Sequence, residues 1–126
     1  MNIKERSLLS EDETEIYCNL NRLMPEGVVV FVKVKLSEFL TPTAEYGTEL
    51  FYHDFLELNN LTAPFLLFDV MNKKACKVIT FINESKKKTT NELSKILEIC
   101  QIPLIEVGSI AELYTLNFFE KKLSIK

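Results

Sequence analysis

The chain has 126 residues, 47% hydrophobic and 26% charged, and its few glycines and prolines exclude a disordered or repetitive protein. A chain of this length buries a core without disulfides, so we expect one domain over residues 1–126 with its core between residues 10 and 118. The formal net charge of -3 excludes a global positive field that would attract nucleic acid.

The sequence contains no apolar run of the roughly 20 residues that a membrane span requires, and its first residues do not form a signal-peptide pattern. The cysteines Cys18, Cys76 and Cys100 lie far apart in apolar segments and form no Cys-x-x-Cys pair. We therefore expect a cytoplasmic protein without a membrane contact, in which the cysteines are reduced and buried.

Three helix starts are predicted by a Ser or Thr that precedes a Glu by three residues, because the two side chains satisfy backbone N–H groups at a helix N-terminus. The pairs are Ser10 with Glu13, Thr89 with Glu92, and Ser109 with Glu112. Apolar residues follow each pair at helical spacing, and the sequence from Pro25 to Gly27 ends the first helix.

Four segments have the composition of strands. Val28 to Lys35 is rich in β-branched residues and ends in alternation, whereas Phe65 to Val70 and Val78 to Ile82 are nearly continuous apolar runs typical of central strands. The turn from Met71 to Lys74 favours antiparallel pairing of those two runs. After the second helix, Ile102 to Val107 completes a strand, helix, strand unit with parallel pairing.

The segment from Ser37 to Thr62 is ambiguous, because its Glu49 to Leu58 portion is compatible with a short helix or a loop. Without that portion the order is α-β-β-β-α-β-α. The fold class is therefore α/β, with a central mixed sheet flanked by helices.

This order and several local motifs resemble a known group of proteins. The motifs are Glu13-Thr-Glu-Ile-Tyr, Met24-Pro-Glu-Gly, Val30-Phe-Val-Lys-Val-Lys-Leu, Phe65-Leu-Leu-Phe-Asp and Gln101-Ile-Pro-Leu-Ile. Between Glu11 and Val107 the chain is similar to a small bacterial family of unknown function in the restriction-endonuclease-like nuclease superfamily. The resemblance implies a restriction-endonuclease-like core and a bacterial mobile-element or DNA-processing context.

Nucleases of that superfamily hold a divalent cation between an Asp at the start of the second strand and an acid in the third, with a Lys or acid two residues on. Such cations need oxygen ligands and activate the attacking water. By this resemblance the motif falls on Pro64, Thr80 and Ile82, and only the first-helix acids Glu13 and Glu15 remain. The resemblance thus implies a degenerate site with no metal, no cofactor and no catalysis.

A different alignment leaves catalysis open. Asp69, followed after fourteen residues by Glu84-Ser85-Lys86, reproduces the nuclease spacing. In this alternative Asp69 and Glu84 hold the metal and Lys86 assists, and the protein is an active metal-dependent nuclease. Short acid and lysine patterns are frequent by chance in a charged chain, so the motif alone does not decide.

Lysines provide the candidate contacts to nucleic acid. Lys86, Lys87 and Lys88 precede a helix, and the turn before the third strand carries Lys73 and Lys74. Lys33 and Lys35 share one face of the first strand. Each group has the alternative explanation of a solvated surface, since neither Arg nor aromatic residues are interleaved with them.

His53 is the only histidine, and it lies beside Asp54 within an aromatic stretch from Tyr46 to Phe55. We interpret it as a structural histidine, because sequence adjacency alone does not build a catalytic triad. The aromatic stretch, with Phe118 and Phe119, either packs on the sheet or marks a protein partner or homodimer surface. The leading hypothesis is an inactive nuclease-like binding or accessory module, and a protein interaction module is a further alternative.

Overall fold

The protein was analysed as a computed structural model, which describes residues 1–82 and 91–116 and, for residues 87–90, the backbone alone. Its elements follow one another as α1 (Glu11–Leu23), β1 (Val28–Lys35), the 3-10 turn η1 (Leu36–Glu38), α2 (Glu49–Asn60), β2 (Thr62–Asp69), β3 (Lys74–Phe81), α3 (Lys87–Ile99), β4 (Leu104–Val107) and α4 (Ile110–Thr115). Among the described residues, no helix is long and apolar enough to cross a membrane.

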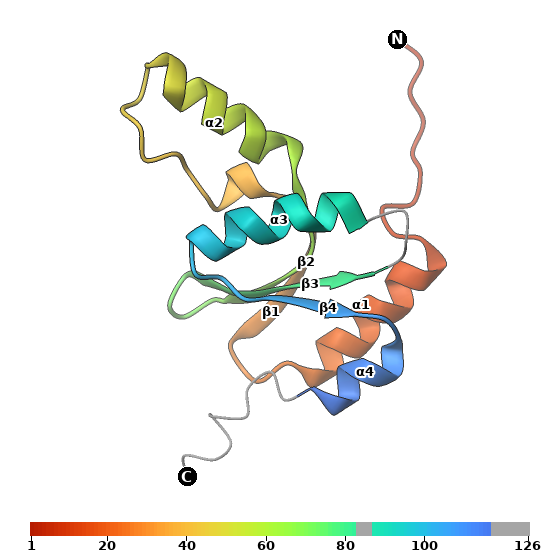
Figure 1. The fold of residues 1–126 in the computed structure, drawn as a ribbon. Helices are drawn as coiled ribbons and strands as arrows, with labels where there is room; N and C mark the ends of the chain where they lie inside the picture. The colour runs from red at the N-terminus through yellow and green to blue at the C-terminus, as the bar shows by residue number, and fades with distance from the viewer. Residues whose placement is uncertain (83–86, 117–126) are drawn as a thin grey trace.

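The four strands form one sheet in the order β1-β2-β3-β4 (Figure 1). β1 and β2 pair antiparallel, as do β2 and β3, whereas β3 and β4 are parallel and joined through α3. The mixed sheet flanked by helices confirms the predicted α/β class. The structure adds α2 to the predicted order. The ambiguous segment that begins at Glu49 is therefore a helix of about three turns.

The helix-start predictions hold at two of three places. Ser10 and Glu13 form the reciprocal capping box of α1, and the Ser109 hydroxyl accepts a hydrogen bond from the Glu112 N–H at the start of α4. The prediction at Thr89 is wrong, because α3 already begins at Lys87 and Thr89 lies inside it. Lysine favours helical conformation, so the helix extends further toward the N-terminus than the capping pattern suggests.

The sheet is packed on both faces. On one face, α1 and α4 contribute Ile16, Leu20 and Leu113 to a buried cluster with residues of all four strands. On the other face, α2 and α3 contribute Leu58, Leu93 and Leu97 to a second cluster. Burial on both faces explains why the sequences of β2 and β3 are nearly continuous apolar runs.

β1 and β2 change face at a shared bend. Val32 and Phe65 pair with each other and pack toward α1, yet Val34 and Ala63, one pair further along, pack in the cluster of α2 and α3. Residues two apart on a regular strand share a face, so the alternation is broken between these pairs. The residue between the two pairs is Lys33 on β1, which has a φ of 52°, and Pro64 on β2, which has no N–H to donate.

Candidate functional site

Glu13, the first-helix acid of the predicted degenerate site, has a structural role at the start of α1. Its Oε1 accepts a hydrogen bond from the Ser10 N–H at 2.8 Å and lies 3.3 Å from Lys33 Nζ. Lys33 Nζ also donates to the Leu8 carbonyl oxygen. The carboxylate therefore caps a helix and ties α1 to the bend in β1.

The bend explains why Lys33 reaches Glu13. A left-handed residue in a strand turns its side chain out of the regular alternation, and here Lys33 reaches toward α1, on the face to which its neighbour Val32 also packs. The prediction that Lys33 and Lys35 share one strand face stays a prediction. Lys35 remains exposed, whereas the Lys33 ammonium is occupied by protein oxygens.

Of the three positions of the degenerate motif, Pro64 and Thr80 lie in the central strands and Ile82 directly follows β3, so together they offer few ligands. Pro64 stands at the bend of β2, and Thr80 in β3 is only 3% exposed. Because Val78 belongs to the α2 and α3 cluster, strand alternation turns Thr80 to that same face, away from α1. Ile82 follows β3 and donates its N–H to the Val107 carbonyl oxygen at 3.0 Å.

A shallow cleft of about 400 Å³ is lined by one of these positions, Ile82. It lies where the start of α1, the end of β3 and the start of α4 meet, and Glu13 and Ile82 both line it. Its other polar groups belong to the first turns of the two helices, including Asp12, Glu15 and Ser109. The carboxylates that line this cleft all come from α1, and Pro64 and Thr80 are not among its lining residues.

Asp69, the first acid of the alternative nuclease motif, lies at the other end of the sheet. It pairs with Lys74 beside the β2–β3 turn, and its carboxylate accepts hydrogen bonds from the backbone and side chain of Asn72 at 3.1 and 2.7 Å. From Lys74 to Phe81 the strand runs about 23 Å away from Asp69, at about 3.3 Å per residue. Glu84 and Lys86 lie outside the described residues.

The candidate lysines fall into two groups that β3 separates. Lys73 and Lys74 lie at the β2–β3 turn, where Lys73 has φ 57°, and Lys87 and Lys88 begin α3 beyond the opposite end of β3 (Figure 1). The described backbone therefore does not bring the two groups into one basic patch. The side chains of Lys87 and Lys88, like Lys86 as a whole, lie outside the described residues.

The aromatic stretch does not pack entirely on the sheet. Phe51 and Phe55 are half-buried and stack at 6.3 Å between ring centroids, but Tyr46 is 77% exposed and Tyr52 47% exposed. A hydrogen bond with Tyr46 raises the pKa of the Tyr52 hydroxyl. Since α2 packs through one side only, its outer side keeps large apolar groups in solvent. Phe118 and Phe119 lie outside the described residues.

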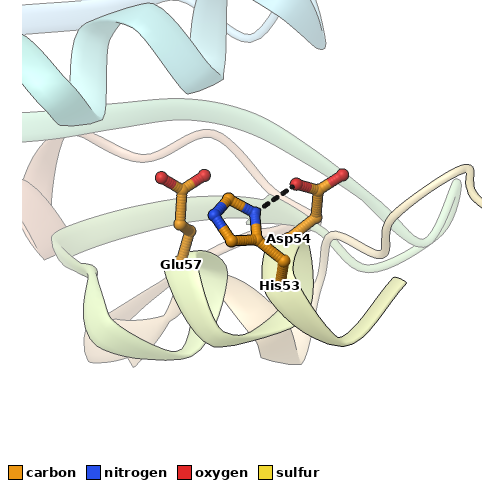
Figure 2. Close-up of side chains that lie close together, drawn as sticks. All are labelled: His53, Asp54 and Glu57. Carbon is orange, nitrogen blue, oxygen red and sulfur yellow. Dashed lines mark hydrogen bonds and ion pairs between the residues drawn. The ribbon is translucent and has the colours of Figure 1, made fainter. Parts of the chain in front are cut away.

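The histidine belongs to a cluster that the sequence reasoning missed. His53, Asp54 and Glu57 lie together on α2, with one nitrogen or oxygen of each within 4.8 Å of the others (Figure 2). The spacing of four residues between His53 and Glu57 was the available signal, because such residues are neighbours on a helix surface. All other described groups of His, Cys, Asp and Glu fall short of this arrangement.

The cysteines differ from the prediction that they are core residues. Cys18 on α1 and Cys100 after α3 are exposed, whereas Cys76 in β3 is half-buried and packs against the cluster of α1 and α4. None of the three forms a disulfide. Cys18 lies on the outer side of α1, because Ile16 and Leu20 of that helix point into the core.

A family model described as "Protein of unknown function (DUF2726)" matches residues 5–116. No curated protein and no solved structure matches the chain. The restriction-endonuclease-like interpretation therefore stays a prediction. Since the matched region covers most of the 126 residues, the chain belongs to the DUF2726 family.

Proposed function

We propose that this domain is a catalytically inactive, restriction-endonuclease-like module that acts by binding a partner. The observation that carries the proposal is the chemistry at the motif positions: a proline at the bend of β2, a buried threonine in β3 and an isoleucine after it. A hard divalent cation needs several oxygen ligands that converge, and these three side chains supply one hydroxyl.

The surroundings of Glu13 support the same proposal. In a metal-dependent nuclease the first-helix acid would be directed at the cation, whereas here its oxygen caps α1 and pairs with Lys33. An ammonium beside the carboxylate replaces the positive charge that a metal would supply. The arrangement stabilises the fold at the position where an active relative would place its metal.

A plasmid-nicking assay with Mg²⁺ or Mn²⁺ tests this proposal, because nicking reports single catalytic events. We expect the wild-type chain to leave supercoiled plasmid intact. Nicking that is lost in both Asp69→Asn and Glu84→Ala would establish the active nuclease and overturn the proposal. Glu26→Gln is the matched control, since it removes one exposed carboxylate outside the candidate sites.

A second candidate, a protein interaction module that does not use nucleic acid, is favoured by the outer side of α2. Leu50, Tyr52 and Leu56 are all exposed there, as is Tyr46 before the helix, although large apolar side chains favour burial. DNA binding that weakens with salt and is lost when Lys86, Lys87 and Lys88 are replaced would contradict this candidate. If the domain is a protein interaction module, we expect no salt-dependent DNA binding by the wild-type chain and no difference in DNA binding between it and the triple variant.

A further inference from the structure

Three potential metal ligands project from one side of α2. In Figure 2 the His53 imidazole lies between the carboxylates of Asp54 and Glu57, with one ring nitrogen toward each. His53 Nδ1 is 3.2 Å from Asp54 Oδ1. Because all three residues lie within two turns of a single helix, the backbone of α2 fixes their relative positions.

The contact with Asp54 gives the two ring nitrogens different roles. When Nδ1–H donates to the Asp54 carboxylate, Nε2 keeps its lone pair and faces Glu57 (Figure 2). Metal-binding histidines commonly have this arrangement, in which a carboxylate on one nitrogen fixes the tautomer and orients the other nitrogen toward the ion. Asp54 then acts as a positioning residue, and His53 and Glu57 act as ligands.

The charge of α2 favours a cation at this place. The helix carries Glu49, Asp54 and Glu57 but no Lys or Arg. Lys95 of α3 lines a cleft with Glu57, yet the described residues form no ion pair between them. The carboxylates of Asp54 and Glu57 together balance the charge of a divalent ion.

We propose that His53 Nε2 and the Glu57 carboxylate bind a divalent transition-metal ion such as Zn²⁺ or Ni²⁺, with Asp54 holding the imidazole in place. An imidazole nitrogen beside a carboxylate suits these ions, whereas Mg²⁺ and Ca²⁺ prefer oxygen ligands alone. Zinc bonds of about 2.0–2.2 Å bring two donors to within roughly 3.5 Å of each other. Exposed His53 and Glu57 can reach that separation by small rotations of their side chains.

The site lies outside the predicted nuclease site, which uses residues of α1, β2 and β3, so it is independent of the proposed function. With two protein ligands, the ion keeps open coordination positions for water or for an external anionic group. Such an external group would find on α2 an accessible metal ion beside the exposed Tyr52 and Leu56.

Nuclear magnetic resonance of the single histidine, combined with calorimetry, tests this proposal on the full chain. During titration with ZnCl₂ or NiCl₂, we expect one ion per chain, and with Zn²⁺ a displaced Nε2 resonance. His53→Ala abolishes binding. Glu57→Gln weakens it by about tenfold or more, and Asp54→Asn weakens it by about 10–100-fold through loss of the orienting carboxylate.

Glu45→Gln is the matched control, because it removes one exposed carboxylate just before α2 and leaves the three residues intact. Its affinity should stay within about twofold of wild type, since exposed charges that do not touch the ion are screened. Circular dichroism checks that each variant keeps its helices. An unchanged histidine spectrum with Zn²⁺ would overturn the proposal, as would Glu57→Gln binding at wild-type affinity, because an isolated imidazole would then explain the binding.

Discussion

Replacing Glu13 tests whether its carboxylate stabilises the fold or is kept for chemistry. Glu13→Ala removes two interactions, the hydrogen bond from the Ser10 N–H at 2.8 Å and the ion pair with Lys33 at 3.3 Å. Glu13→Gln removes only the charge, because the Gln side-chain oxygen still accepts the backbone N–H in a capping box. The two variants therefore separate the contribution of the cap from that of the ion pair.

The structure sets the size of each effect. The Glu13 and Lys33 side chains are 29% and 40% exposed, so solvent screens their pair, and its loss in Glu13→Gln costs about 0.5 kcal/mol. Losing the reciprocal cap adds about 0.5–1 kcal/mol, near the lower end of measured cap substitutions. Glu13→Ala should therefore lower the free energy of unfolding by about 1–1.5 kcal/mol, or the melting temperature by roughly 3–6 °C.

Urea denaturation followed by circular dichroism measures both variants. The cost of Glu13→Gln should shrink in high salt, while the additional cost of Glu13→Ala should persist, because only the ion pair is screened. Glu11→Gln is the control, since it removes one exposed charge from the first turn of the same helix at a residue that does not line the cleft. A Glu13 variant more stable than wild type would refute the reasoning, because carboxylates gathered for metal binding usually lower stability.

Four further changes have defined outcomes. Lys73→Gly should raise the free energy of unfolding by up to about 1 kcal/mol in urea denaturation, because Lys73 has a left-handed backbone at φ 57°. Leu67→Ala should lower it by about 3–5 kcal/mol in the same assay, since Leu67 is fully buried. Thr80→Glu should lower it by more than about 2 kcal/mol, because the 3% exposed site would bury a carboxylate, whereas Thr80→Val should be nearly neutral. Tyr46→Phe should lower the pKa of Tyr52 in an ultraviolet titration, because the hydrogen bond with Tyr46 raises that pKa. In the wild-type chain, this hydrogen bond stabilises the fold while Tyr52 is protonated, and the stabilisation is lost as the pH rises through the Tyr52 pKa.

Sequence reasoning succeeded where local patterns and burial agree. The Ser10 capping box and the buried runs of β2 and β3 each have a direct physical signature, so the α/β class followed from them. The sequence did not decide whether the α2 segment is a helix or a loop, because its apolar residues lie on both the inner and the outer side, as half-buried Phe51 and exposed Leu56 show. Such a helix lacks the polar face that identifies an amphipathic one.

The environment of the candidate residues was harder to predict. The left-handed conformation of Lys33 is not encoded in its residue type, and it decides which side of the sheet its ammonium reaches. Likewise, β3 separates Lys74 from the lysines at the start of α3 by its whole length, so whether these lysines form one basic patch depends on where β3 begins and ends. The His53 and Glu57 spacing was readable in advance, but its meaning depended on α2 being a helix with that side in solvent.

The central proposal, that the predicted nuclease-like site holds no catalytic metal, is tested most directly by calorimetric titration of Mn²⁺ into the His53→Ala variant. That variant removes the proposed site on α2, so any remaining ion reports on the sheet and α1. The account predicts no saturable heat of binding. A single Mn²⁺ site that disappears in Glu13→Gln, Asp69→Asn or Glu84→Ala would contradict it.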